Sequence, residues 1–340
     1  MAPRHLWTLV AIACAAWLGW ILWPSQSPDA NAALDSVAAP APALAPPAPL
    51  ADAIGPLDGL SSRQRRAFVV TEAFSPLPAP GPGDWLTFHE EEPQTVADYF
   101  VSGANDPTGP RNVIYVLPVG PLPADRGPTT GELSSYAHDF FSLEARVLPP
   151  LDLDALDVTR RVHYGSPQLN AADILDHMEL RLPDDAYCMI AVTWSDLYPE
   201  DSYNFVFGLA RLTHRVGVFS FARLHPDFYG DVRADPSEVH RLVERRAFAV
   251  MSHEMGHMFG LGHCVFLGCT MNGSNSLEES DRQPMHLCPV CLRKLHLALG
   301  FDPEQRYEAL QAQYARAGLH KEEAWVQQRR AFIAAKPDPS

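Results

Sequence analysis

Three histidines and a glutamate lie close together in the sequence, at spacings that suit metal binding. His253 and His257 are four residues apart in a segment predicted to be helical, so their imidazoles project from one face and can bind a single ion. Glu254 lies beside that face, where its carboxylate can reach a water on the metal. Gly260 ends the helix and lets the chain turn back, which returns His263 to the same ion. Three histidines leave a fourth position open for water, as in catalytic zinc sites.

This arrangement predicts a hydrolytic reaction. Zinc lowers the pKa of its bound water to about 7, which supplies a nucleophile at neutral pH. Glu254 would accept the proton of that water and pass it to the leaving amine. The sequence therefore predicts a zinc-dependent metallopeptidase that acts on a peptide or protein substrate. The alternative is a zinc-stabilised protein that binds peptides with a dormant site, although such a protein has no need of a general base.

Four of the six cysteines form a second cluster directly after the third histidine. They are Cys264, Cys269, Cys288 and Cys291. A group of four cysteines that includes a C-x-x-C pair is a usual source of tetrahedral zinc coordination. Two disulfides with a single zinc elsewhere would be the alternative in an exported domain. We predict two zinc ions, one catalytic and one structural, and we expect the structural ion to fix the loop that carries His263.

The elements that position these residues can be read from residue patterns. Asp235, Pro236 and Glu238 form a helix-start signal, and the helix that follows should run to Gly260. Further helices are predicted over 136–148, 171–182, 303–317 and 320–335, and strands over 113–117, 186–193, 205–212 and 216–222. Helices and strands alternate first, and then strands follow one another. This order favours an α/β sheet with at least one antiparallel edge.

The extended metal motif resembles that of the archaemetzincins, in particular the eukaryotic-type members. The residues that carry the resemblance are H-E-x-x-H-x-x-G-x-x-H over 253–263, C-x4-C-x-M over 264–271, and the C-x-x-C pair over 288–291. The resemblance extends over about residues 68–335. It implies a compact metzincin-like α/β domain with a mixed sheet, a long zinc-binding helix and a four-cysteine structural zinc site. It also implies that Met271 packs beneath the metal, and some members of the family are described as aminopeptidases.

The resemblance raises three expectations about substrate binding. An upper edge strand over 216–221 would align an extended peptide by main-chain pairing. Astacin-like enzymes carry a tyrosine two residues after the methionine, but that position here is Gly273, so transition-state stabilisation must come from another group. Glu278 and Glu279 could bind the amino terminus of a substrate, or they could simply belong to a solvated loop or helix start.

The N-terminal region has the composition of an anchor followed by a spacer. Residues 5–23 contain no Asp, Glu, Lys or Arg and would span about 28 Å as a helix, close to the thickness of a bilayer. A signal peptide cleaved near residues 30–32 is the alternative. We therefore predict a transmembrane anchor or signal at 1–23, a Pro/Ala-rich linker at 24–58 and the peptidase domain at 59–340. The catalytic domain would be held outside the cytoplasm by this membrane segment, or secreted after cleavage.

Composition limits the classes of partner. The chain has 340 residues, of which 46% are hydrophobic and 20% charged, which is typical of a globular protein with a sizeable core. Its formal net charge of -15 argues against nucleic acid as a partner, because a phosphate-binding surface needs clustered Lys and Arg.

Overall fold

The fold is built on one mixed β-sheet. The computed structural model describes residues 10–13, 42–103, 107, 109–231 and 235–335. The strands follow the spatial order β3-β2-β6-β9-β8-β7-β5-β4, and β1 pairs with the other edge of β8. Their bounds are β1 Val10–Ala13, β2 Val113–Pro118, β3 Glu144–Val147, β4 Arg160–His163, β5 Ser166–Asn170, β6 Ala186–Thr193, β7 Asp196–Tyr198, β8 Val206–Arg211 and β9 Val216–Ser220. Strands β3, β2, β6 and β9 run parallel, whereas β8 runs antiparallel to β9, so the predicted mixed α/β sheet is confirmed.

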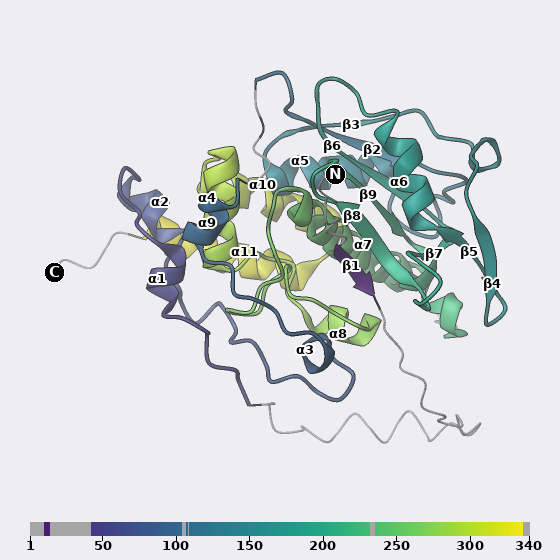
Figure 1. Ribbon diagram of the computed structural model, residues 1–340. Helices are drawn as coiled ribbons and strands as arrows, with labels where there is room; N and C mark the ends of the chain where they lie inside the picture. Colours follow the sequence, from purple (N-terminus) through teal and green to yellow (C-terminus); the bar gives the residue numbers. More distant parts are fainter. Residues whose placement is uncertain (1–9, 14–41, 104–106, 108, 232–234, 336–340) are drawn as a thin grey trace, which may run out of the picture.

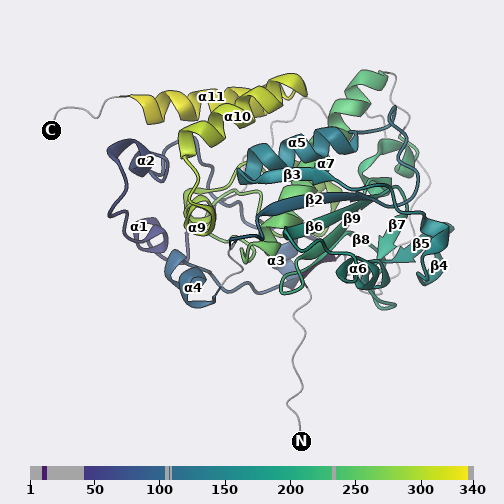
Figure 2. The same cartoon turned by 90° about the horizontal axis from the view of Figure 1, so that it is seen from above.

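Alternating side chains of the central strands enter two separate cores. In β2, Ile114 and Val116 face the core beneath α5 (Thr130–Phe141) and α7 (Pro236–Met258). Tyr115 and Leu117 face the opposite core, which contains apolar residues of α6 (Ala171–Glu179). Figure 2 shows this layering, with α6 on one side of the sheet and α5 and α7 on the other. Because both faces are covered, the central strands read as continuous apolar runs.

Helix α7 begins where its sequence signal places it. The Asp235 side chain accepts a hydrogen bond from the Ser237 backbone N–H at 2.8 Å, and Pro236 occupies the first helical position. Most residues from Val243 to Met258 are buried, so the C-terminal half of the helix lies in the core. This burial holds the metal-motif residues against the sheet.

Most of the remaining helices pack together beside the sheet. Figure 1 shows α1, α2, α4, α9, α10 and α11 on the side of the molecule away from β4 and β5. Helix α10 packs on α5 and α11, α11 packs on α2, and α9 packs on α1 and α4. The bounds are α1 Leu50–Ile54, α2 Ser62–Arg66, α3 Trp85–Phe88, α4 Val96–Val101, α8 Leu277–Arg282, α9 Pro289–Leu299, α10 Pro303–Arg316 and α11 His320–Ala334, with 3₁₀ turns at Leu153–Ala155, Ala222–Leu224 and Pro226–Tyr229.

Part of the predicted linker packs on the domain. Helix α1 buries Ala53 and Ile54 in the same core as the metal helix. Residues 42–58 therefore differ from the expected extended spacer, because their alanine, leucine and isoleucine side chains find an apolar partner in α9. Residues 24–41 of the linker lie outside the described residues, so its limits stay a prediction.

Two predictions about single elements are wrong. The helix predicted over 136–148 ends at Phe141, because Ser142 adopts a left-handed conformation with φ of 54°, and β3 follows. The strand expected to form an exposed edge over 216–221 is β9, which lies inside the sheet between β6 and β8. Both β8 and β9 pack against helix α7, and it is β8 that lies against the metal motif, with Gly208 beside Glu254.

The predicted membrane anchor is also corrected. Among the residues that the structure describes, no helix has the length and apolar character needed to cross a membrane. Within the segment 5–23, Val10–Ala13 form strand β1, and the other residues of that segment lie outside the described part of the chain. The membrane-anchored localisation expected from the sequence is contradicted by this finding.

Candidate metal centre

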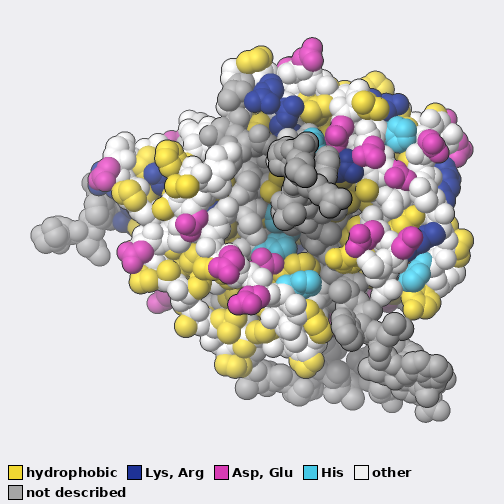
Figure 3. All heavy atoms as spheres, in the orientation of Figure 1, with side chains coloured by type: hydrophobic (Ala, Val, Ile, Leu, Met, Phe, Trp, Pro, Cys, Tyr) yellow, Lys and Arg dark blue, Asp and Glu magenta, His cyan; other side chains and the backbone are white. Residues whose placement is uncertain are grey.

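The structure brings the three motif histidines to one point. Ligand atoms of His253, His257 and His263 all lie within 4.8 Å of one another, and all three side chains are buried. The Nε2 atoms of His253 and His257 are 2.9 Å apart. Helix α7 supplies the first two residues on one face, and the turn at Gly260, whose φ is 82°, returns the chain to supply the third. On the face of the molecule drawn in Figure 3, histidine side chains lie near the middle, with acidic side chains on either side.

Each of the three imidazoles has a hydrogen-bond acceptor at its other nitrogen. The Nδ1 atom of His253 lies 2.9 Å from the Thr270 carbonyl oxygen, and that of His257 lies 2.8 Å from the Leu261 carbonyl oxygen. The third partner is a carboxylate, since Nδ1 of His263 lies 2.6 Å from Oε1 of Glu91. Because a carbonyl or carboxylate oxygen only accepts, the proton resides on each Nδ1 and the Nε2 lone pairs point to the common centre.

This donor set fits a zinc ion. Two Nε2 lone pairs at 2.9 Å repel each other unless a cation lies between them. The His263 Nε2 atom is buried and has no hydrogen-bond partner among the described residues. Burial, with a smaller contribution from His263, lowers the pKa of His253 to about 3, so its ring is neutral and can act as a ligand. Neutral imidazoles with outer hydrogen bonds are the usual form of zinc-binding histidines.

Glu254 lies beside this centre without a partner of its own. Its side chain is fully buried, and both carboxylate oxygens lack a hydrogen-bond partner among the described residues. Burial raises the pKa of Glu254 to about 8. The backbone of β8 passes close by, because a Cβ atom placed on Gly208 would lie 2.7 Å from Oε1 of Glu254. A glycine at this position therefore leaves room for the carboxylate.

Met271 packs directly against the metal helix. A Cβ atom placed on Gly256 would collide with the Met271 sulfur, so the sulfur occupies the space that the glycine leaves. Gly256 lies between Glu254 and His257 in the motif, so the methionine packs against the turn of helix that carries these residues. This is the position that the family resemblance implied for Met271.

The four clustered cysteines come together as a second donor set. The Sγ atoms of Cys264, Cys269, Cys288 and Cys291 all lie within 4.8 Å of one another, and each of these cysteines is free and buried. Neighbouring thiols hold the pKa of Cys264 well below its usual range, whereas burial raises the pKa values of Cys269 and Cys288. The described residues thus contain no disulfide in this cluster, and four sulfurs at these distances fit a tetrahedral zinc site.

A single asparagine fixes the loop between the first two cysteines. The Asn272 side-chain oxygen accepts from the Cys269 N–H at 2.7 Å, and its nitrogen donates to the Cys264 carbonyl at 2.7 Å. The Cys264 N–H in turn donates to the Met271 carbonyl at 2.7 Å. These short hydrogen bonds tie the cysteine loop to Met271, which packs against the metal helix.

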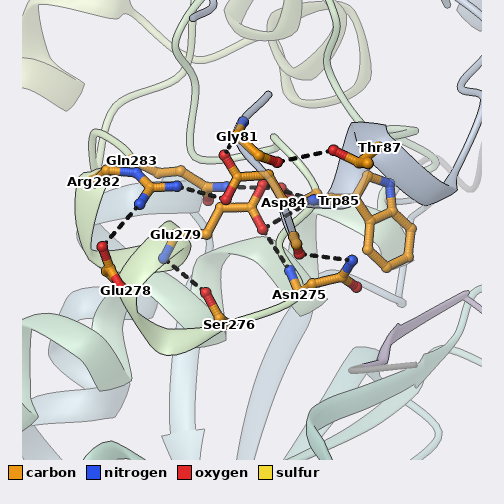
Figure 4. Close-up of polar contacts among 12 residues, drawn as sticks. Gly81, Asp84, Trp85, Thr87, Asn275, Ser276, Glu278, Glu279, Arg282 and Gln283 are labelled. Atoms are coloured by element: carbon orange, nitrogen blue, oxygen red, sulfur yellow. Dashed lines mark hydrogen bonds and ion pairs between the residues drawn. The ribbon is translucent and has the colours of Figure 1, made fainter. Parts of the chain in front are cut away.

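Glu278 and Glu279, the acidic pair after this loop, interact with other residues of the protein. The Glu279 carboxylate accepts from the backbone N–H groups of Trp85 at 2.9 Å and Asn275 at 2.7 Å (Figure 4). Glu278 is exposed and pairs with Arg282 at 3.3 Å. The helix-start interpretation of these residues is therefore confirmed by α8, and both oxygens of Glu279 accept hydrogen bonds from the protein backbone.

Gly273 packs against an aromatic ring from a distant part of the chain. A Cβ atom on Gly273 would collide with the indole of Trp85. The position where astacin-like enzymes carry a tyrosine is therefore adjacent to Trp85, whose Nε1 atom donates to Oε1 of Glu91 at 2.6 Å. Trp85, Glu91 and Gln94 were not predicted from the sequence, because no local spacing links them to the metal motif.

An extensive cavity lies beside the third histidine. It has a volume of about 830 Å³, and its lining includes His263 and the apolar side chains of Leu86, Met285 and Trp325. The N-terminal region, the loop after Met271 and helices α10 and α11 all contribute to it. A mainly apolar cavity next to a metal centre can accept an apolar side chain of a ligand.

The chain is similar to known zinc peptidases. A model of peptidase family M54 matches residues 169–297. Archaemetzincin-2 of Macaca fascicularis is 38% identical over 270 residues, which cover 71% of this chain and 74% of that protein. Archaemetzincin-1 of Mus musculus is 32% identical over 257 residues, which cover 67% of this chain and 51% of that protein. A crystal structure of an archaemetzincin from Methanopyrus kandleri aligns with a TM-score of 0.42 at 27% identity, over 57% of this chain and 99% of the other.

Proposed function

Because the chain belongs to the archaemetzincins, a family of zinc metallopeptidases, we propose that it hydrolyses peptide bonds at the three-histidine centre. In this proposal His253, His257 and His263 hold a catalytic zinc, and Glu254 is the general base. The four cysteines of the second donor set hold a structural zinc. The reaction type is that of a metzincin.

One observation carries the proposal. All three imidazoles hold their Nδ1 protons against acceptors, which leaves three Nε2 atoms directed to one centre, and an unpartnered carboxylate lies next to them. A buried glutamate without a hydrogen bond is costly to the folded state, so its retention supports a role in chemistry. A site that only stabilised the fold would not need Glu254.

The residues of the chain account for the proton transfers. When bound, zinc supplies Lewis acidity, which makes water a nucleophile near neutral pH and polarises the scissile carbonyl. The positive charge of a bound zinc would favour the ionised form of Glu254 despite its burial. The carboxylate would then accept the proton of the attacking water and deliver it to the nitrogen of the leaving amine. Burial of Glu254 keeps bulk water away from the carboxylate during this transfer.

The substrate would lie along β8. This strand passes the general base, and its outer edge already accepts an antiparallel strand, since Ala11 of β1 pairs with Leu209. An extended peptide that displaces β1 could pair with the same main-chain groups of β8. The apolar cavity beside His263 supports a preference for an apolar substrate residue on that side of the centre. Aminopeptidase cleavage is a narrower form of the proposal that rests on the family alone.

The experiment that tests the proposal uses the zinc-loaded whole chain and a diverse peptide mixture. Mass spectrometry locates the new termini, and Glu254→Ala is the control. New termini that depend on Glu254 support the enzyme, and their distance from the amino terminus separates aminopeptidase from endopeptidase cleavage. If no peptide is cut while zinc stays bound, the peptide-binding alternative replaces the proposal.

A further inference from the structure

We infer that Glu91 positions His263 for the catalytic zinc. Glu91 belongs to a segment that lies outside the region matched by the family model. The inference rests on the proposed role of His263 as a zinc ligand. The segment spans residues 84–94, which we call the strap. It includes α3 and the loop that follows, more than 70 residues before the matched region begins at residue 169.

The contact between Glu91 and the third histidine differs from the other two outer contacts. His253 and His257 donate to backbone carbonyl groups, whereas His263 donates to a carboxylate at 2.6 Å. The side chain of Glu91 is only 21% exposed. A hydrogen bond to an ionised acceptor in a buried position is stronger than one to a neutral carbonyl. It fixes the ring orientation and raises the basicity of the ligand nitrogen.

Glu91 is itself held in place by Trp85. The indole Nε1–H donates to the same Oε1 atom at 2.6 Å, and the indole ring packs edge-on against the His263 ring at a centroid distance of 4.9 Å. The backbone N–H of Trp85 donates to Glu279, and its ring fills the space above Gly273. The strap is therefore anchored to the loop that follows Met271.

Gln94 attaches the end of the strap to the turn that carries His263. Its Nε2 atom donates to the Gly260 carbonyl at 3.1 Å, and its Oε1 atom accepts from the Gly262 N–H at 3.0 Å. The buried ammonium group of Lys294 donates to the same Oε1 atom at 3.0 Å. This turn contains two glycines, which have more conformational freedom than other residues, and the Gln94 contacts add to its own hydrogen bonds. The strap thus holds both the turn and the ring of the third ligand.

The test compares zinc affinity in three whole-chain proteins: the parent, Glu91→Gln and Glu92→Gln. Glutamine retains the size of the side chain and an accepting oxygen but removes the charge. Glu92 is exposed, so the same substitution at this neighbouring position is a matched control. We expect Glu91→Gln to weaken binding at the histidine site about 10-fold or more, measured by competition with a chromophoric chelator. The Glu92 variant should bind like the parent.

Substitution of Co²⁺ for zinc gives a spectrum that would not change if Glu91 only stabilised the fold. We expect the visible absorption bands of Co²⁺ at the histidine site to shift in Glu91→Gln, while the sulfur-to-cobalt charge-transfer bands of the cysteine site stay unchanged. Thermal unfolding shows whether each variant is folded. If Glu91→Gln is folded and its affinity and Co²⁺ spectrum match those of Glu92→Gln, the inference is overturned. This outcome is separate from a failure of the proposed function, because metal binding is measured without a substrate.

Discussion

The Nδ1 atom of His253 lies 2.9 Å from the carbonyl oxygen of Thr270, the residue between Cys269 and Met271. The backbone of the cysteine loop therefore orients one imidazole of the three-histidine cluster. The direct bond between His263 and Cys264 in the chain is a second link. Because His253 and His263 are each linked to the cysteine loop, we expect a change in that loop to shift both imidazoles.

We expect Cys264→Ser to weaken zinc binding at both sites. Loss of one sulfur removes the second ion, and the loop that holds the Thr270 carbonyl and His263 then loses its restraint. Elemental analysis after dialysis against a weak chelator should find fewer than one zinc per chain, against two in the parent. Cys188→Ser, a buried cysteine of β6 outside the cluster, is the control. Full retention of the histidine-site zinc in Cys264→Ser would rule out the coupling.

We expect Glu254→Gln to retain zinc and lose activity. The amide occupies the same buried space against Gly208 but cannot accept a proton from water. The rate should fall by about 100- to 10,000-fold, which is the usual contribution of a general base. Peptide cleavage and zinc content are measured on the same sample. A variant that cleaves at the parent rate would mean that another group is the base.

We expect Gly256→Ala to destabilise the protein. The added methyl group would collide with the Met271 sulfur, which cannot move far because the surrounding core is buried. Overpacking of this kind costs about 1–3 kcal/mol in the free energy of unfolding. Gly131→Ala in α5 is the matched control, because its nearest atom, the Thr129 hydroxyl oxygen, would be 3.8 Å from the new Cβ. Equal unfolding free energies for the two variants would contradict the packing argument.

We expect Glu244→Gln to stabilise the protein at alkaline pH. Burial, with a contribution from the Glu132 charge, raises the pKa of Glu244 from its usual 4.5 to about 7. The folded state therefore favours the protonated form, and the parent loses stability as the pH rises from about 4.5 to about 7. The shift corresponds to about 3 kcal/mol as an order of magnitude. The cavity around this carboxylate is also lined by His240, Arg241 and Arg316.

The measurement for Glu244 is the free energy of unfolding in urea at pH 4.5 and pH 8. The glutamine variant should exceed the parent at pH 8 and match it at pH 4.5. Comparing the two proteins at each pH cancels the pH dependence of zinc binding that they share. Glu238→Gln, at an exposed position on the same helix, should follow the parent at both values. A difference that does not change with pH would contradict the assignment to ionisation.

Short-range spacing was enough to predict that the three histidines would meet at one point. His253 and His257 lie one helical turn apart, Gly260 permits the reversal, and His263 follows three residues later, so α-helix geometry alone brings them near one another. The cysteines were predictable because four sulfurs within 28 residues of chain have few other structural uses. The start of α7 was equally local, since Asp235 caps the helix within its first turn.

Other elements depended on partners that local patterns do not specify. The segment 144–147 joins β2 as a parallel edge strand, although its residues also suit the end of a helix. Strand β9 is interior because β8 pairs with its free side. Residues 42–58 have a spacer-like composition, but the apolar surface of α9 gives α1 a place to pack.

The sequence by itself determined which residues could hold zinc and which could act as the base, because these depend on contacts within a few turns of chain. The tertiary structure decided how those residues are held. Glu91 and Gln94 reach the third histidine and its turn across sequence separations of 172 and 168 residues. Contacts at such separations depend on how the N-terminal strap packs on the sheet domain. No periodicity or motif in the strap predicts that packing. The strap contains several acidic residues, and its sequence does not indicate which of them contacts His263.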